Sequence, residues 1–405
     1  MSFTQTEKDE SVRNTSFFAR IFSCLVYPGM AFSLLPILAS LTLLGIQPGN
    51  RTYGPSHWFV TYQHGFLRRA LIGQLLSRIH FLSLHAIFAI EAVIFLLAMM
   101  LTVLVFRPLL FGSLSERRFT AFLLASPAFL PHMAYMNGEM DNFLYIALLP
   151  GAFALVRLRN VLGLAIATTG VLVGLLIHEA FALMFYPLIL VLALDLMYRR
   201  RLHFAWVAVH LAIVVAAFVG IIHFGKLSGS PAEWIAHAQQ RTDMRIDKIV
   251  FQVLDSSLAE QLRFVSRLYR PKLIVTVLVT ISLGIPYGIV LWRWLRTAFV
   301  ICGYSRMQAR WMLLIFAAPL TLSVVGHDVM RWVSALCINV SLYLLFLYQS
   351  EPIATHGKTA NLRTALTAWT EGSTYAATLL YLLAVGPWGF SGNLLIGNLA
   401  HLFVP

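Results

Sequence analysis

Charged and imidazole side chains gather in four short stretches of a chain that is otherwise strongly apolar. Arginine guanidinium groups bind and neutralise phosphate, whereas carboxylates and imidazoles accept and release protons. These residue types suit a reaction in which a phosphate leaves and a hydroxyl is deprotonated. The four stretches are His64 with Arg68 and Arg69, Glu139 with Asp141, His178 with Glu179, and His327 with Asp328 and Arg331.

The arginines of the first stretch have no acidic residue near them in the sequence. No Asp or Glu occurs between Ile46 and Ile90, so the counter-ion of Arg68 and Arg69 must come from elsewhere. A carboxylate on another segment, a lipid headgroup or a phosphorylated substrate would each serve. Apolar residues also recur with a helical period over 62–73, which predicts an amphipathic helix in the membrane interface whose arginines reach phospholipid.

The next two stretches each allow a structural and a chemical interpretation. Glu139 and Asp141 form a pair of oxygen ligands suited to a divalent metal, but Asp141 would also cap the helix that follows it. His178 and Glu179 fall where the chain must turn between two spans. They form either part of a site or a satisfied buried pair.

The last stretch is equally open. Asp328 and Arg331 are spaced i, i+3, so they would form an ion pair within one helix. In the alternative interpretation, Asp328 is a general base and Arg331 binds an anion. Glu91 and Asp195 lie within apolar runs, away from the four stretches, and are interpreted as structural.

The composition is that of a membrane protein. The 405 residues are 59% hydrophobic and only 12% charged, with a mean hydropathy of +0.76, whereas soluble domains are about 25% charged. The net charge of +13 is attributed to basic loops beside an anionic membrane face and not to nucleic-acid binding. The three cysteines are scattered, which indicates neither a disulfide framework nor a zinc site.

Apolar runs of span length predict the fold class. We expect an all-α polytopic bundle of about eleven spans, in which 1–21 form a cytoplasmic segment and 22–405 a single transmembrane domain. The outer segment 47–84 and the long outer loop 225–272 are expected to carry amphipathic interfacial helices. The candidate spans lie near 22–46, 85–106, 119–136, 142–156, 161–177, 180–197, 204–224, 273–292, 311–326, 330–348 and 373–390.

Basic residues alternate from loop to loop. Arginines fill the loops near 107–118, 157–159, 199–201 and 293–310, whereas those near 133–141 and 178–179 carry no Lys or Arg. By the positive-inside rule, this pattern predicts that the N-terminus is inside. The 40 residues between Arg159 and Arg199 would make a helix of about 60 Å, twice the membrane thickness, so the chain must turn back at 177–180. All four polar stretches then lie on the outer face.

The sequence contains no Gly-rich phosphate loop and no dinucleotide fingerprint. No line of charges runs through the spans, and no repeat with broken helices is evident. The residues favour transfer of a sugar from a polyprenyl phosphate or pyrophosphate, with arginines neutralising the leaving phosphate and a carboxylate deprotonating the acceptor. A transporter or flippase for an anionic lipid-linked sugar and a non-catalytic membrane subunit are the alternatives.

With outward polar clusters on about eleven spans and an amphipathic first outer loop, the chain resembles the membrane glycosyltransferases of the GT-C class and the O-antigen and exopolysaccharide polymerases. The resemblance covers most of the chain as architecture. Such glycosyltransferases typically carry an acidic pair in the first outer loop. The nearest match here, Glu139-Met140-Asp141, comes one outer loop later.

This resemblance implies a multi-pass protein of the bacterial inner membrane. Its expected partners are a lipid-linked sugar donor, a glycan or lipid-linked acceptor and membrane lipids, with no nucleic acid. A divalent metal at Glu139 and Asp141 is left open as a cofactor. The implied roles are phosphate binding for Arg68, Arg69 and Arg331, catalysis for Asp141, Glu179 and Asp328, and an auxiliary part for His64, His178, His327 and Glu139.

Overall fold

The computed structural model describes nine ranges of the chain. The predicted segment 1–21 and the predicted spans near 22–46 and 373–390 lie outside them, as do His64 and His327. The described ranges are 52–63, 65–136, 138–227, 229–256, 258–268, 271–324, 326, 328–350 and 358–368.

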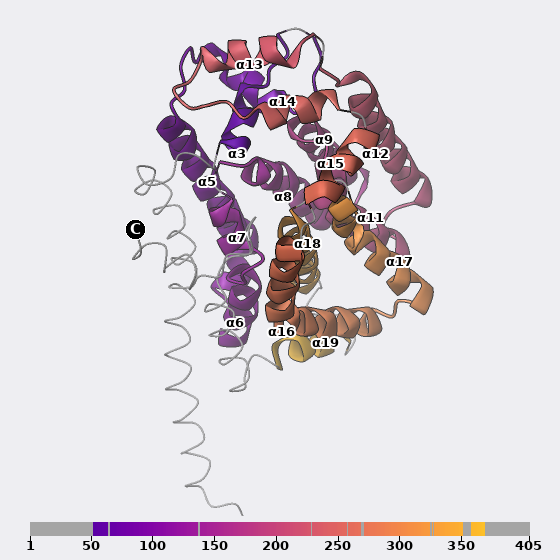
Figure 1. The fold of residues 1–405 in the computed structure, drawn as a ribbon. Helices are drawn as coiled ribbons and strands as arrows, with labels where there is room; N and C mark the ends of the chain where they lie inside the picture. The colour runs from indigo at the N-terminus through magenta and orange to yellow at the C-terminus, as the bar shows by residue number, and fades with distance from the viewer. Residues whose placement is uncertain are drawn as a thin grey trace, which may run out of the picture.

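The described residues form helices joined by turns and loops and contain no β-strand, which confirms the all-α class (Figure 1). The helices are α3 (Tyr53–Ser56), η2 (His57–Phe59), α4 (Leu71–Leu75), η3 (Leu76–Arg78), α5 (Leu84–Leu110), α6 (Leu114–Leu124), α7 (Leu130–Tyr135), α8 (Asp141–Leu158), α9 (Val161–Ile177), α10 (Phe181–Met184), α11 (Tyr186–Tyr198), α12 (Phe204–Phe224), α13 (Pro231–Gln239), α14 (Lys248–Asp255), α15 (Leu258–Leu268), α16 (Pro271–Ile301), α17 (Arg306–Phe316), η4 (Ala318–Val324), α18 (Val329–Ser350) and α19 (Lys358–Ala368).

Several of these helices are suited to a membrane. Within the described residues, α5, α8, α12 and α18 are long and apolar enough to cross one, and α17 with η4 makes a fifth, bent by 42°. The helices α9 and α11 are apolar but shorter. The predicted bounds 161–177 and 204–224 agree with α9 and α12 to the residue. The full count of eleven spans stays a prediction.

Helix α18 forms the centre of the bundle. In its most apolar window 83% of the residues are buried, against 22% for the peripheral α12. Figure 1 shows α18 passing between α5 and α11, and it contacts α5, α8, α11 and α16. Next to it, α8 and α9 form the most extensive helix pair. Gly170 permits this close packing, because a Cβ there would lie 2.6 Å from the carbonyl oxygen of Ala147.

The span predicted near 119–136 is broken in the structure. Helix α6 ends at Leu124 and α7 begins only at Leu130. Pro127 lies in the interruption and lacks the N–H that a continuing helix requires, and it disfavours helical geometry at Ser126. A hydropathy pattern does not register this break, because the residues on both sides of it are apolar.

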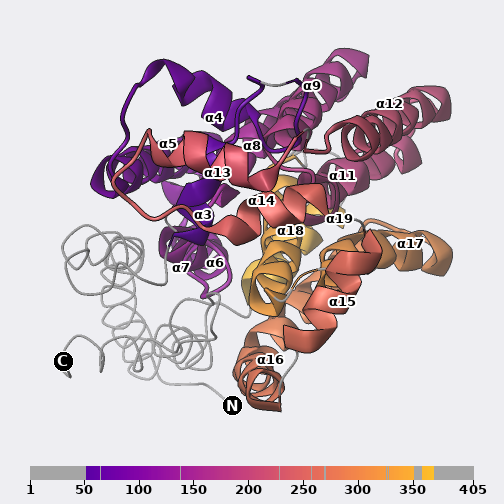
Figure 2. The same ribbon diagram turned by 45° about the horizontal axis from the view of Figure 1, so that its top comes forward.

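A layer of short helices covers one end of the bundle. Figure 2 shows α13 and α14, from the predicted long loop, lying across α3. Hydrogen bonds from two backbone N–H groups join this layer to the start of α5. Leu82 N–H donates to the Arg241 carbonyl at 2.8 Å, and Leu84 N–H donates to the Asp243 side-chain Oδ1 at 3.1 Å. The charged side chains around Arg69 and Arg331 lie beneath this layer.

The amphipathic helix predicted over 62–73 is wrong. Among the described residues of this range, the only α-helix is α4, which begins at Leu71. Arg69 adopts a left-handed backbone conformation with φ of 64°, which cannot continue a right-handed helix. Leu67 and Ala70 are buried, so the apolar pattern that predicted the helix instead anchors an irregular segment.

Candidate functional site

Arg331 is the centre of an acidic cluster. It lies in the first turn of α18, and its Nε donates to Asp141 Oδ2 at 2.9 Å and to Oδ1 at 3.1 Å. Its Nη2 also donates to Asp141 Oδ1. Its Nη1 lies 3.7 Å from Glu139 and 3.6 Å from Asp328. One guanidinium therefore joins the start of α18 to the start of α8 and faces three carboxylates.

Arg69 forms a second buried pair with Glu179. Its Nε lies 2.9 Å from both carboxylate oxygens, and its Nη2 lies 2.5 Å from Oε1. Glu179 follows the end of α9, so the turn predicted at 177–180 places this carboxylate at the same end of the bundle. The counter-ion of Arg69 is thus a carboxylate on another segment, as one of the sequence interpretations expected.

The backbone at Arg69 is strained where its side chain contacts Glu179. Left-handed conformations are uncommon for residues other than glycine and cost about 1–2 kcal/mol. Such outliers persist only when the surrounding structure enforces them, and they cluster at functional sites. Here the unusual φ accompanies a buried side chain that reaches Glu179.

Tyr53 and His57 lie between the two clusters. Tyr53 feels the charges of Arg69 and Arg331 as well as those of the nearby carboxylates. The His57 ring lies 6.1 Å from the His178 ring, and its Nδ1 is buried without a hydrogen-bond partner among the described residues. The two clusters therefore belong to one buried polar site.

The structure brings most of the predicted residues together. Arg69, Glu139, Asp141, His178, Glu179, Asp328 and Arg331 all lie in this site, although they come from four distant stretches of sequence. His64 and His327 lie outside the described residues.

Arg68 binds backbone carbonyl groups and not a carboxylate. Its Nη2 donates to the carbonyl oxygens of Val253 at 2.7 Å and Leu254 at 3.4 Å, so it fixes the end of α14. Its Nε is buried without a hydrogen-bond partner among the described residues. Burial lowers the pKa of Arg68, and Glu179 only partly opposes this shift. A guanidinium held by two carbonyl groups is a positioning element, unlike its neighbour Arg69.

Glu139 and Asp328 hold their protons unusually tightly. Burial raises the pKa of Glu139 to about 7, although Arg331 opposes the shift. Burial likewise raises the pKa of Asp328 to about 6, again against Arg331. Both share a single nitrogen of Arg331, which is not enough to keep two buried carboxylates fully ionised. Proton exchange near neutral pH is therefore available at these two groups.

Glu179 and the histidines behave in the opposite way. Burial alone would raise the pKa of Glu179, but Arg69 outweighs it and holds that pKa well below the usual range. Burial, reinforced by Arg69, lowers the pKa of His57 and of His178 well below 6.5. His178 Nδ1 also accepts the N–H of Ala180, so its 3.5 Å contact with Glu179 is not an ion pair. The imidazoles are neutral and Glu179 is ionised.

Arg331 takes the place where a metal ion would have to bind. Within the described residues, no three His, Cys, Asp or Glu side chains are arranged to hold a metal ion. Glu139 and Asp141, the proposed ligand pair, both face the guanidinium instead. The capping alternative for Asp141 is also not observed, because Met140 is the N-cap of α8 and Asp141 binds Arg331.

Sequence reasoning missed several members of the site. Glu91 was interpreted as structural, yet it is fully buried and accepts a hydrogen bond of 2.8 Å from Asn142, next to Asp141. A glutamate inside an apolar run is itself a signal of function. Tyr53 and His57 carried no such signal, because neither belongs to a recognisable motif.

Glu139 is positioned by the two short helices α3 and η2. Trp58 Nε1 donates to the carbonyl oxygen of Gly138 at 3.3 Å, which fixes the loop before α8. Gly54 leaves room for the carboxyl group, since a Cβ there would lie 2.6 Å from Glu139 Oε1. The Glu139 side chain is 20% exposed, against 3% for Asp141, and is therefore the more accessible of the two.

No family model, no curated protein and no solved structure matches this chain. Its function therefore has to be inferred from the residues and geometry described above.

Proposed function

We propose that this chain is a membrane glycosyltransferase or polysaccharide polymerase that uses a polyprenyl-phosphate-linked or pyrophosphate-linked sugar. In this proposal it resides in a bacterial inner membrane and acts at the outer face. The single observation that supports this most strongly is the cluster around Arg331, in which a buried cation faces two carboxylates that titrate near neutral pH. Such a site can take up a proton and stabilise a phosphate in the same place.

The chemistry is an inverting displacement. A carboxylate removes the proton from an acceptor hydroxyl, and the hydroxyl oxygen attacks the anomeric carbon of the donor sugar. The bond between that carbon and the phosphate oxygen breaks, and its electron pair goes to the departing phosphate. Arginine neutralises the charge that develops there. No covalent intermediate with the protein is required.

The geometry refines the roles within the site. Asp141 and Glu179 are each held by two-pronged contacts to an arginine, so we assign them to positioning and not to proton transfer. Glu139 is the more accessible carboxylate and has a pKa of about 7, which suits a general base. Asp328 is the second candidate base. Arg331 reaches the phosphate through Nη1, the nitrogen with the longest contacts.

The proposed orientation places this site outside and the N-terminus inside. The site lies at the end of the bundle where α8 and α18 begin and where α9 finishes. The opposite end of α8 carries Arg157 and Arg159, and the end of α11 beside it carries Arg199; basic residues favour the inner side of a membrane. The complete arrangement of about eleven spans is part of this proposal.

The double substitution Glu139→Gln with Asp328→Asn, which removes both candidate bases, separates the proposed enzyme from its alternatives. The purified chain in liposomes is given short-chain polyprenyl-phosphate hexoses together with glycan and lipid-linked acceptors. Three quantities are measured: donor binding, release of polyprenyl phosphate, and passage of donor across the bilayer. An enzyme loses release and keeps binding. A flippase loses passage and shows no release in the wild type. A non-catalytic subunit shows neither activity in either form.

The control for this experiment is Glu233→Gln. Glu233 is an exposed carboxylate in the first turn of α13 and belongs to the same covering layer. The Glu233→Gln variant should release polyprenyl phosphate at the wild-type rate. Absence of release from the wild type with every hexose tested would contradict the proposal.

A further inference from the structure

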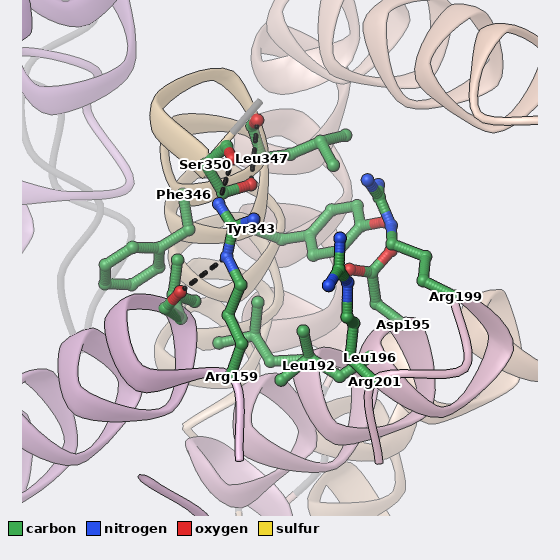
Figure 3. Close-up of a pocket in the computed structure, with 11 residues that line it drawn as sticks. Arg159, Leu192, Asp195, Leu196, Arg199, Arg201, Tyr343, Phe346, Leu347 and Ser350 are labelled. Carbon is green, nitrogen blue, oxygen red and sulfur yellow. Dashed lines mark hydrogen bonds and ion pairs between the residues drawn. The ribbon is translucent and has the colours of Figure 1, made fainter. Parts of the chain in front are cut away.

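A second site lies at the opposite end of the bundle, where three helices end together. A cavity of about 240 Å³ is enclosed by the C-terminal ends of α8, α11 and α18 (Figure 3). Its volume is several times the roughly 30 Å³ that one water molecule takes, yet it is smaller than the roughly 300–1,000 Å³ of a pocket for a whole drug-sized ligand. The cavity has the size of a lipid headgroup.

The backbone directs three arginines at this cavity. Arg159 follows α8 in a left-handed conformation with φ of 53°. Arg200 is also left-handed, with φ of 57°, and it separates Arg199 from Arg201, which both line the cavity while Arg200 does not. Figure 3 shows the guanidinium groups of Arg159 and Arg201 reaching the same space from two segments.

The three guanidinium groups differ in what already holds them. Arg159 donates to the carbonyl oxygens of Val156, at 3.2 Å, and of Ser350. Arg199 pairs with Asp195 at 2.9 Å. Within the described part of the chain, the Arg201 side chain has no carboxylate, carbonyl or hydroxyl partner.

The charge of the cavity is positive on balance. Helix C-termini carry partial negative charge and attract basic residues, which accounts for Arg159. That effect does not account for Arg201, and among the described residues Asp195 is the only acidic one in the lining. Three full positive charges outweigh one carboxylate and the partial charges of three helix ends. The cavity is therefore built for an anion.

Apolar side chains complete the wall. Leu192, Leu196 and Phe346 contribute apolar side chains to the lining. We propose that this cavity binds the phosphate of an anionic amphiphile, with Arg159, Arg199 and Arg201 on the phosphate and the leucines beside its apolar part. Basic pockets between membrane helices bind anionic lipid headgroups in this way. The inference does not depend on the proposed catalytic function.

Arg201→Gln tests this site and Arg200→Gln is its matched control. The full chain, purified in a non-ionic detergent, is titrated with phosphatidylglycerol, with phosphatidylcholine or with inorganic phosphate. Bound probe is measured by native mass spectrometry and by the melting temperature. Loss of one charge-assisted contact should weaken phosphatidylglycerol binding roughly tenfold in Arg201→Gln and leave Arg200→Gln near the wild type.

The probes also identify the source of the phosphate. If inorganic phosphate stabilises the wild type but not Arg201→Gln, the phosphate group alone is recognised. If only phosphatidylglycerol shows this difference, the apolar part is needed as well, and either result supports the site. The proposal is overturned if Arg201→Gln binds phosphatidylglycerol and inorganic phosphate as the wild type does. It is also overturned if Arg200→Gln binds these probes as weakly as Arg201→Gln does.

Discussion

The carboxylates around Arg331 differ in how firmly they are held, and this difference separates their roles. Asp141 takes two nitrogens of the guanidinium at hydrogen-bonding distance, whereas Glu139 and Asp328 share the third at 3.6–3.7 Å. A carboxylate bound by two nitrogens is held rigidly in place, while a loosely shared one can take up a proton. In the proposed reaction, proton transfer is therefore assigned to Glu139 and Asp328.

The raised pKa of Glu139 predicts a stability that falls with rising pH. Because the native state binds this proton more tightly than the unfolded chain, ionisation costs stability between about pH 4.5 and pH 7. The loss is up to about 3 kcal/mol. Glu139→Gln should remove this dependence, so that its melting temperature relative to the wild type rises across the window. Glu233→Gln should run parallel to the wild type; a parallel course for Glu139→Gln would contradict the assigned pKa.

The pair of Arg69 and Glu179 makes a second prediction. Glu179→Gln leaves a buried guanidinium without its counter-ion and should destabilise the protein by about 3–5 kcal/mol. Replacing both residues by leucine removes the charge along with its partner, so the double variant should be more stable than Glu179→Gln. Chemical denaturation in detergent measures both. Equal stabilities of the two variants would show that the pair is not a coupled unit.

At the residue scale, the sequence allowed part of the site to be predicted. The absence of acidic residues near Arg69 indicated that its counter-ion comes from elsewhere, and of the three sources left open the structure shows a carboxylate on another segment. The partner itself could not be predicted, because the pairing depends on how helices far apart in the sequence are arranged. For the same reason, neighbouring Arg68 and Arg69 were assigned one role, although Arg68 holds the end of α14.

At the scale of elements, long apolar helices were predictable and short polar ones were not. The bounds of α9 and α12 follow from apolar runs that end at charged or polar residues. The segment before α4 was predicted as a helix, because its periodicity does not register the left-handed conformation of Arg69. That conformation depends on a tertiary contact with Glu179, which local sequence cannot specify.

The short helix α3 positions Glu139, and Gly54→Ala tests this. The added methyl group would lie 2.6 Å from Oε1 and 3.0 Å from the Gly138 carbonyl oxygen, so the flexible carboxyl end must move and the carbonyl must shift slightly. We expect release of polyprenyl phosphate to fall with little loss of stability. Gly220→Ala is the control, since its methyl group would meet nothing within 4 Å. Equal activities of the two variants would exclude a positioning role for α3.

At the scale of the whole molecule, two polar ends are separated by an apolar bundle. One end carries the buried site beneath α13 and α14, and the other carries the basic cavity (Figures 2 and 3). The alternation of basic loops in the sequence predicted this segregation of polar groups. It could not predict a second cavity, because a cavity results from the relative placement of three helix ends.

The proposed orientation predicts opposite accessibility of the two ends. Gln240→Cys and Arg200→Cys, both exposed, are placed separately in a background whose three cysteines are replaced by alanine. A membrane-impermeant thiol reagent applied to intact spheroplasts should label the Gln240 position and leave the Arg200 position unlabelled until permeabilisation. The reverse pattern would place the N-terminus outside and the proposed site on the cytoplasmic face.

The most direct test of the proposed function is the structure of the full chain with a short-chain polyprenyl phosphate bound. We predict that the phosphate lies within hydrogen-bonding distance of Arg331, next to Glu139, with the α13–α14 layer displaced to admit it. A phosphate found only in the cavity of Arg159, Arg199 and Arg201, with the Arg331 cluster unchanged, would support the second site. It would contradict the assignment of the Arg331 cluster as the place of glycosyl transfer.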